Sequence, residues 1–180
     1  MVLVVITQPS LLVTLSEVKT ALGESSTDRD AMITTALRAA QAELDGPSGR
    51  VGMVVASTTV EQRSPGFDDP IVLSAVPVTS VTTIKYLDTA GVEQTLSAGS
   101  YTVLSDGRIE LNPGYSWPGL YADEEAVRIR FVAGMAAGDI RIDLMKAAII
   151  MHVKMTIDMA DPAVYQNTIR NLLVPLRAWL

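Results

Sequence analysis

The chain contains no cysteine and a single histidine, and these absences remove several classes of chemistry. Without cysteine there can be no disulfide framework and no thiolate metal site. His152 has no second histidine with which to bind zinc and no sign of a catalytic triad, so we interpret it as a structural side chain. Glycine-rich loops of the kinds that hold phosphates are also missing. We therefore expect no catalytic residues, no cofactor and no metal.

Charged residues are also few, and most of them are acidic. They make up 19% of the chain, and the formal net charge is −6 at pH 7. This balance argues against a dedicated nucleic-acid binder, whose affinity comes largely from Lys and Arg neutralising phosphates. The hydrophobic fraction of 48% is high beside so little charge, a combination typical of a subunit that assembles with others.

No apolar run is long enough to cross a membrane. The first six residues are apolar but too few for the core of a signal peptide. The longest apolar stretch, residues 142–160, is interrupted by five ionisable side chains. We expect an intracellular product without membrane contacts.

Apolar spacing predicts two helices near the beginning of the chain (residues 14–46) and two near its end (139–170). Thr14 and Glu17 have the spacing of a capping box, which predicts a helix over residues 15–22. A second helix is predicted from about Asp28 to Leu44, and a third over about 140–160. Asp161 followed by Pro162 is typical of the first residues of a fourth helix.

Between the helices, from about residue 53 to 132, the apolar period changes to two. Short Val-, Thr- and Ile-rich runs predict strands, and Asp106-Gly107 predicts a tight hairpin turn. The predicted strands are 54–55, 58–62, 71–73, 81–87, 92–96, 101–104, 108–111 and 127–132. The predicted fold class is α+β: a helical base carrying an inserted antiparallel β-rich subdomain, within a single domain of residues 1–180.

The final segment, residues 171–180, is apolar, with four Leu, one Val and one Trp in its last nine residues. Burying one such Leu is worth roughly 1.5–3 kcal/mol, so this surface is costly to leave in water. The segment therefore either packs on its own domain or docks on a partner.

Two further groups of residues are candidates for contacts. Tyr115, Trp117 and Tyr121 place three aromatics close together in a Pro- and Gly-containing loop. Such a loop can fold over a sheet edge, or it can be a contact loop, since Tyr and Trp are enriched at interface hot spots. Arg128 and Arg130 share a strand face, where they can pair with nearby acids or contact an acidic neighbouring subunit. Residues 123–125, all acidic, are interpreted as a solvated turn.

The order of motifs along nearly the whole chain resembles that of the head–tail connector (adaptor) proteins of long-tailed bacteriophages and gene transfer agents. The resemblance begins with the helical segments 15–22 and 28–44 and continues through the strands 71–78 and 81–88 with Gly91. The remaining matching elements are Tyr101 to Val103, Arg108-Ile109, Trp117-Pro118, 127–134, the long helix, and Leu172 to Arg177. The chain departs from the family pattern at 151–154, where the family often has an aromatic residue and an arginine. It also departs at Leu176-Arg177, where an aromatic–arginine pair is commoner.

The resemblance implies a structural virion protein of the capsid–tail neck, made in the host bacterial cytoplasm. Such adaptors bind the portal protein after DNA packaging and form a ring, usually twelvefold, that extends the DNA channel. They offer a surface to stopper and tail-terminator proteins, and double-stranded DNA passes through without sequence readout. On this basis we expect the end of the chain to dock on the portal. The residues expected to do so are Arg170, Leu172, Leu173, Leu176, Arg177 and Trp179.

Three other interpretations remain open from the sequence. The chain could be a stopper or tail-completion protein of the same neck. It could be a small ligand-binding β module that uses Tyr115, Trp117 and Tyr121. An enzyme is the weakest interpretation. If the chain is a neck protein, the residues expected to contact a neighbouring subunit or the tail are Tyr115, Trp117, Tyr121, Arg128 and Arg130.

Overall fold

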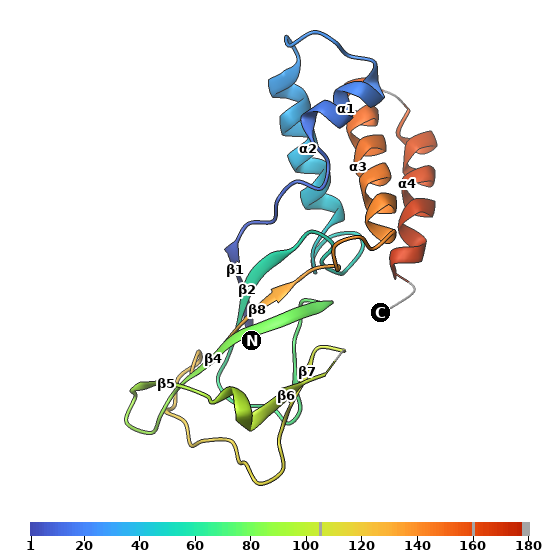
Figure 1. Cartoon of the computed structure of the whole chain (residues 1–180). Helices are drawn as coiled ribbons and strands as arrows, with labels where there is room; N and C mark the ends of the chain where they lie inside the picture. The colour runs from blue at the N-terminus through green and yellow to red at the C-terminus, as the bar shows by residue number, and fades with distance from the viewer. Residues whose placement is uncertain (105, 160, 178–180) are drawn as a thin grey trace. The chain divides into compact units, whose positions relative to one another are not determined.

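The computed structural model describes residues 1–104, 106–159 and 161–177 (Figure 1). Within these ranges the chain forms two compact units. The β unit consists of residues 1–9 and 57–134, and the helical unit consists of residues 10–56 and the described residues from 135 onward. The chain passes from one unit to the other three times, so neither unit is one continuous piece of sequence.

Helix α1 (Leu15–Leu22) has the capping box expected from the sequence. The backbone N–H of Glu17 donates to the Thr14 hydroxyl at 3.2 Å, and the Glu17 carboxylate accepts the backbone N–H of Thr14 at 2.6 Å. These two bonds satisfy backbone donors that a helix start otherwise leaves free. Gly23 ends the helix with a φ of 69°, a left-handed conformation that glycine adopts without strain.

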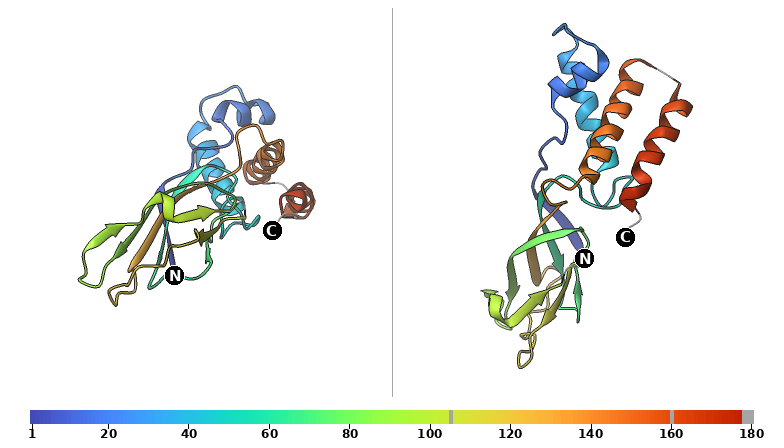
Figure 2. Two further views of the ribbon diagram at one scale, coloured as in Figure 1. Left: turned by 60° about the horizontal axis from the view of Figure 1, so that its bottom comes forward. Right: turned by 45° about the vertical axis from the view of Figure 1, so that its right-hand side comes forward.

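The other helices are α2 (Asp30–Leu44), α3 (Arg141–Ile157) and α4 (Pro162–Arg177). The carboxylate of Asp161 accepts the backbone N–H of Ala163 at 2.9 Å, so the fourth helix begins as the sequence predicts. Helices α3 and α4 lie side by side (Figures 1 and 2). The core of the unit is built from apolar residues repeating every three or four positions. Its fully buried members include Ile33, Leu37, Leu44, Met145, Ile149, Val153, Ile169, Leu173 and Leu176.

Asp45 fixes the loop that follows α2. Its carboxylate accepts backbone N–H groups from Gly46 at 2.8 Å, Val55 at 2.7 Å and Ala56 at 3.0 Å. Burial raises the pKa of Asp45, although the three backbone donors oppose the shift. The loop folds back because one side chain satisfies donors at both of its ends, and Met53 and Val55 thereby join the helical core.

The β unit contains two antiparallel sheets. The first has five strands in the order β1-β2-β8-β4-β5, and the second has three in the order β3-β7-β6. The first sheet consists of β1 (Val2–Thr7), β2 (Thr58–Ser64), β8 (Val127–Ala133), β4 (Val78–Leu87) and β5 (Glu93–Thr95). The second consists of β3 (Ile71–Val72), β7 (Arg108–Leu111) and β6 (Tyr101–Val103). A 3-10 turn, Ala98–Ser100, precedes β6.

Strand β8 is central in the five-stranded sheet (Figure 1). Its side chains alternate in burial: Val127, Ile129, Phe131 and Ala133 are buried, whereas Arg128 and Arg130 lie on the other face. Ile129 lies opposite Gln62 of β2 and Ile84 of β4. The buried Gln62 amide reaches Ser74 and the carbonyl of Val72, so its polar atoms are satisfied inside the unit.

The predicted α+β class is confirmed, with two helices before and two after the main β region. Two predicted details are wrong. Residues 54–55 form no strand: Val55 packs into the helical core, and Val54 is buried beside it in the chain. Residues 2–7, taken from the sequence only as a short apolar run, form β1. The prediction that the whole chain is one connector domain stays a prediction. None of the helices in the described ranges is both long and apolar enough to span a bilayer.

We expect Asp45→Ala to lower the free energy of unfolding by about 2–4 kcal/mol, because it leaves three backbone donors without their acceptor. Urea unfolding followed by circular dichroism measures this change. The matched control is Asp158→Ala at an exposed aspartate after α3, which should change stability by less than about 0.5 kcal/mol. Equal effects of the two substitutions would contradict the role given to Asp45.

Candidate assembly surfaces

The aromatic loop, residues 115–121 between β7 and β8, packs at the end of β4 in the five-stranded sheet. Trp117 stacks on Phe67 with ring centroids 4.6 Å apart and an interplanar angle of 12°, and Phe67 meets Tyr86 edge-on at 5.9 Å. The backbone N–H of Tyr121 donates to the carbonyl of Leu87 at 3.1 Å, which ties the loop to the end of β4. Trp117 is therefore largely a packing residue. Tyr115 and Tyr121 are 56% and 49% exposed and remain available for contacts.

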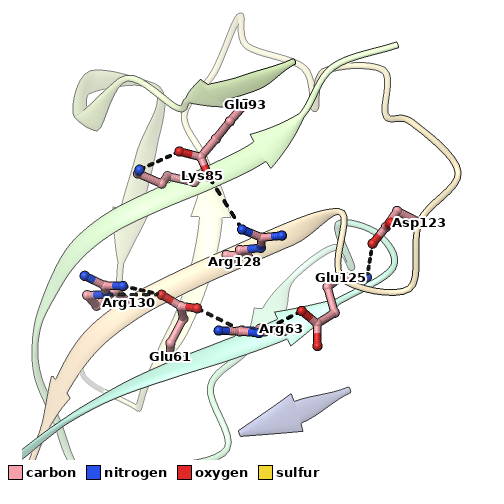
Figure 3. Close-up of polar contacts among 8 residues, drawn as sticks. All are labelled: Glu61, Arg63, Lys85, Glu93, Asp123, Glu125, Arg128 and Arg130. Carbon is pink, nitrogen blue, oxygen red and sulfur yellow. Dashed lines mark hydrogen bonds and ion pairs between the residues drawn. The ribbon is translucent and has the colours of Figure 1, made fainter. Parts of the chain in front are cut away.

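Arg128 and Arg130 lie in a charged network on one face of the five-stranded sheet (Figure 3). Glu61, whose side chain is only 7% exposed, accepts hydrogen bonds from Arg130 at 2.7 Å and Arg63 at 2.8 Å. Arg63 also reaches Glu125 at 2.8 Å. On the β5 side, Glu93 pairs with Lys85 at 2.6 Å and with Arg128 at 3.6 Å. Both predicted arginines therefore have acidic partners within their own chain.

Glu61 is the acidic centre of this network. Burial raises the pKa of Glu61, but hydrogen bonds from Arg130 and Arg63 outweigh it, so the pKa lies below its ordinary value. A carboxyl whose pKa is lower in the folded state stabilises the fold above its unfolded pKa. That stabilisation is lost as the pH falls through the folded value. The network therefore contributes fully at neutral pH and fails in acid.

Helix α4 was expected to supply portal-docking residues, and the structure divides them into two groups. Leu173 and Leu176 are buried in the helical core, where they have no surface for a partner. Leu172 is half-buried, and Arg170 and Arg177 are exposed. Residues 171–177 continue α4, so up to Arg177 the segment packs on its own unit, one of the two alternatives the sequence left open. Trp179 lies outside the described residues.

Arg170 and Arg177 share a shallow hollow on the helical unit with a residue the sequence did not single out, Arg50. Gln166 and Asn167 of α4 also line this arginine hollow. Part of this hollow was predictable from the sequence, because Arg170 and Arg177 are seven residues apart and so face the same side of a helix. Arg50 comes from the loop after α2, and only the fold brings it there.

His152 of α3 contacts a carboxylate of α2. Its Nε2 lies 2.8 Å from a carboxylate oxygen of Glu43, which also pairs with Arg50 at 2.5 Å. Among the described residues, no three His, Asp or Glu side chains are grouped so that they could hold a metal ion.

These surfaces and the fold define an α+β protein whose exposed features suit contacts with other proteins. The chain belongs to the head completion protein family, because the model of that family matches residues 11–159. A search of curated proteins gives no match to the sequence.

Solved structures of gene transfer agent (GTA) particles contain chains of similar fold. In a virion of a native GTA particle, a chain is 25% identical with a TM-score of 0.72, and the match covers 96% of this chain and 95% of that one. In the neck of a native GTA particle computed with C12 symmetry, a chain is 25% identical with a TM-score of 0.71, covering 96% and 94%. In the neck of an empty GTA particle computed with C6 symmetry, the values are 24% and 0.72, covering 98% and 95%.

We expect Glu61→Gln to destabilise the protein at pH 7 by about 1–3 kcal/mol, because the neutral amide removes the charged acceptor of Arg130 and leaves Arg63 with Glu125 alone. As the pH falls through the lowered pKa of the folded Glu61 carboxyl, the wild type loses this stabilisation, and the difference in unfolding free energy between the two proteins should shrink. Urea unfolding at several pH values measures both effects. Glu110→Gln is the control, since Glu110 lies 3.6 Å from Arg108 at the surface and such pairs contribute little. A constant difference across the pH range would contradict the assignment.

Proposed function

We propose that this protein is a head–tail connector of a bacteriophage or gene transfer agent neck. It binds the portal after DNA packaging, forms a ring that extends the DNA channel, and offers an attachment surface to stopper and tail proteins. The observation that carries the proposal is the near-complete match of its fold to chains in GTA neck structures, together with membership of the head completion family. Its role is structural, and the necks computed with C12 and C6 symmetry support assembly as a ring.

Ring assembly requires two different, complementary surfaces on each copy. The two compact units differ in kind and offer such surfaces. Strand β1 is an edge strand of the five-stranded sheet, and its sequence has no charge or proline to discourage pairing. Val2, Val5 and Ile6 of this strand are 51%, 47% and 41% exposed. The exposed Tyr115 and Tyr121, with the partly exposed Arg128 and Arg130, are further proposed contacts to a neighbouring subunit or tail protein.

For the portal we propose the exposed side of α4. Val164, Thr168 and Leu172 are spaced four residues apart and so lie on one flank of the helix, defined here as the valine flank; Val164 and Thr168 are exposed, and the half-buried Leu172 forms its edge against the core. Val164 is 66% exposed, and apolar exposure on a helix is a common basis for docking. Arg170 and Arg177, also expected to contact the portal, lie on the opposite flank at the arginine hollow.

DNA is proposed to pass through the ring without base readout. The net charge of −6 per copy, multiplied around a ring, repels a polyanion and discourages sticking. Tight binding of duplex DNA in a filter-binding measurement at physiological salt would contradict this passage role.

The same neck includes stopper and tail-completion proteins, and the family description also suits such a protein. Binding to the portal distinguishes the two, because portal binding is the part of the proposed role that belongs to the connector. A ligand-binding β module has less support, since Trp117 is occupied by Phe67.

We expect the purified chain to bind the portal ring from the same genome, which size-exclusion chromatography with light scattering detects as added mass. Val164→Asp with Thr168→Asp should weaken binding about tenfold or more, because it places charge in an apolar contact. The matched control is Met32→Asp, at a 49%-exposed methionine of α2, which should bind as the wild type does.

Absence of portal binding by the wild-type chain would favour a stopper or tail-completion protein. Binding that survives the double substitution would keep the connector role and place the portal contact elsewhere. Truncation before α4 is a poor test, because Ile169, Leu173 and Leu176 belong to the helical core.

A further inference from the structure

The arginine hollow holds positive charge that the described chain does not neutralise. Arg177 donates through Nη2 to the backbone carbonyl of Arg50, and Arg170 donates to the side-chain oxygen of Asn167 at 2.7 Å. Neither forms an ion pair with a carboxylate of the described residues. Both guanidinium groups are oriented by neutral oxygens and keep donors free for an anion.

The hollow is held in place by a chain of polar contacts. His152 of α3 contacts Glu43 of α2, Glu43 pairs with Arg50, and the carbonyl of Arg50 accepts from Arg177 of α4. The Arg50 side chain is held by Glu43, and the Arg177 side chain is held by the Arg50 carbonyl. Because both side chains are already ordered, binding a ligand costs less side-chain entropy.

Charge is divided unevenly between the two units. Each unit has ten of the 20 acidic residues, but the β unit has only five of the 14 basic residues. The formal charge of the β unit is therefore −5, and that of the helical unit is −1. In charge, the β unit of another copy is therefore a suitable partner for the arginine hollow.

Within the β unit, Asp68 and Asp69 are the adjacent carboxylates best placed to bind. Both are exposed, and neither makes a side-chain hydrogen bond or ion pair with the described residues. By contrast, the carboxylates of Asp88, Asp106 and Asp123 accept hydrogen bonds from residues near them in the chain. Glu124 is also unpaired, but it lies singly beside these engaged groups.

We propose that the arginine hollow of one copy binds Asp68 and Asp69 of the next copy in the ring. This inference rests on the ring assembly proposed above and names the contact. It is heterologous, since the hollow and the aspartates belong to different units, and such contacts can continue from copy to copy until the ring closes. The arginines of one copy then attract the aspartates of the next, which offsets the repulsion between two chains of net negative charge. The valine flank of α4 stays free for the portal.

Duplex DNA is a poorer occupant of the hollow. A phosphate backbone is bound by several cations along its length. Here three arginines gather at one point of a chain whose net charge is −6.

The absence of cysteine permits a direct test by cross-linking. Two single-cysteine proteins are made, Ala163→Cys at the hollow and Pro65→Cys beside the aspartates; both positions are exposed. They are mixed at high concentration and on the portal ring, and treated with a short bismaleimide. Because each copy has one cysteine, a 65–163 link can form only between copies. The control mixture replaces Pro65→Cys with Ala90→Cys, at an exposed turn of the same unit.

We expect a cross-linked dimer from the 65 and 163 mixture, in at least about tenfold higher yield than from the 90 and 163 mixture, as expected for a specific contact. Adding Arg170→Glu and Arg177→Glu to the hollow protein should abolish the excess. Adding Asp68→Arg and Asp69→Arg to its partner should restore it. Arg38→Glu, at an exposed arginine of α2, should leave the yield unchanged.

The proposed contact would be overturned by equal dimer yields from the two mixtures, both at high concentration and on the portal ring. It would also be overturned if Arg170→Glu with Arg177→Glu left the excess of cross-linked dimer unchanged. Portal binding is read separately by light scattering. A chain that binds the portal without the 65–163 link keeps the connector function and loses this contact. A chain that forms the link but does not bind the portal keeps the contact and loses the connector function.

Discussion

The β unit depends on the central position of β8, which pairs with β2 on one side and β4 on the other. A strand turns successive side chains to opposite faces, so a slip of one residue would place Arg128 and Arg130 in the core. Glu61 reinforces the correct register, because it lies directly opposite Arg130 and is hydrogen-bonded to it. The charged face therefore specifies how the apolar face packs, in addition to any contact it makes with other proteins.

Local chemistry explains which elements were predictable from the sequence. Helix α1 was predicted with correct bounds, because Thr14, Glu17 and Gly23 carry the signals for its two ends within a few residues. Strand β1 was missed because its partner β2 lies more than 50 residues away and nothing near residues 2–7 reveals the pairing. Residues 54–55 show the opposite case: their apolar, β-branched character suits a strand, but Asp45 binds the loop backbone and directs it to the helical core.

The assembly surfaces were predictable to a smaller extent. The apolar character of the final helix was plain, but spacing alone could not decide whether Leu173 and Leu176 face a core or a partner. The core of α2 and α3 decided it, because it needs those two side chains. The place of Arg50 in the hollow could not be predicted from the sequence. It depends on the fold of the loop after α2 and on the contacts of Glu43 with Arg50 and with His152 of α3. Interaction sites built from distant segments are visible only after folding.

The passage of the chain between its units has a consequence for synthesis on the ribosome. Strand β1 is made first but must wait for β2, and α2 must wait for α3 and α4, which are made last. Both units therefore remain incomplete in the nascent chain until late: the β unit until β8 has emerged, and the helical unit until α4 has emerged. The exposed core of α2 needs protection during this interval, which makes an unfinished copy a natural client for a ribosome-associated chaperone. Until α4 has emerged, the core positions of Ile169, Leu173 and Leu176 stay empty, and the apolar residues they cover on the other helices remain exposed.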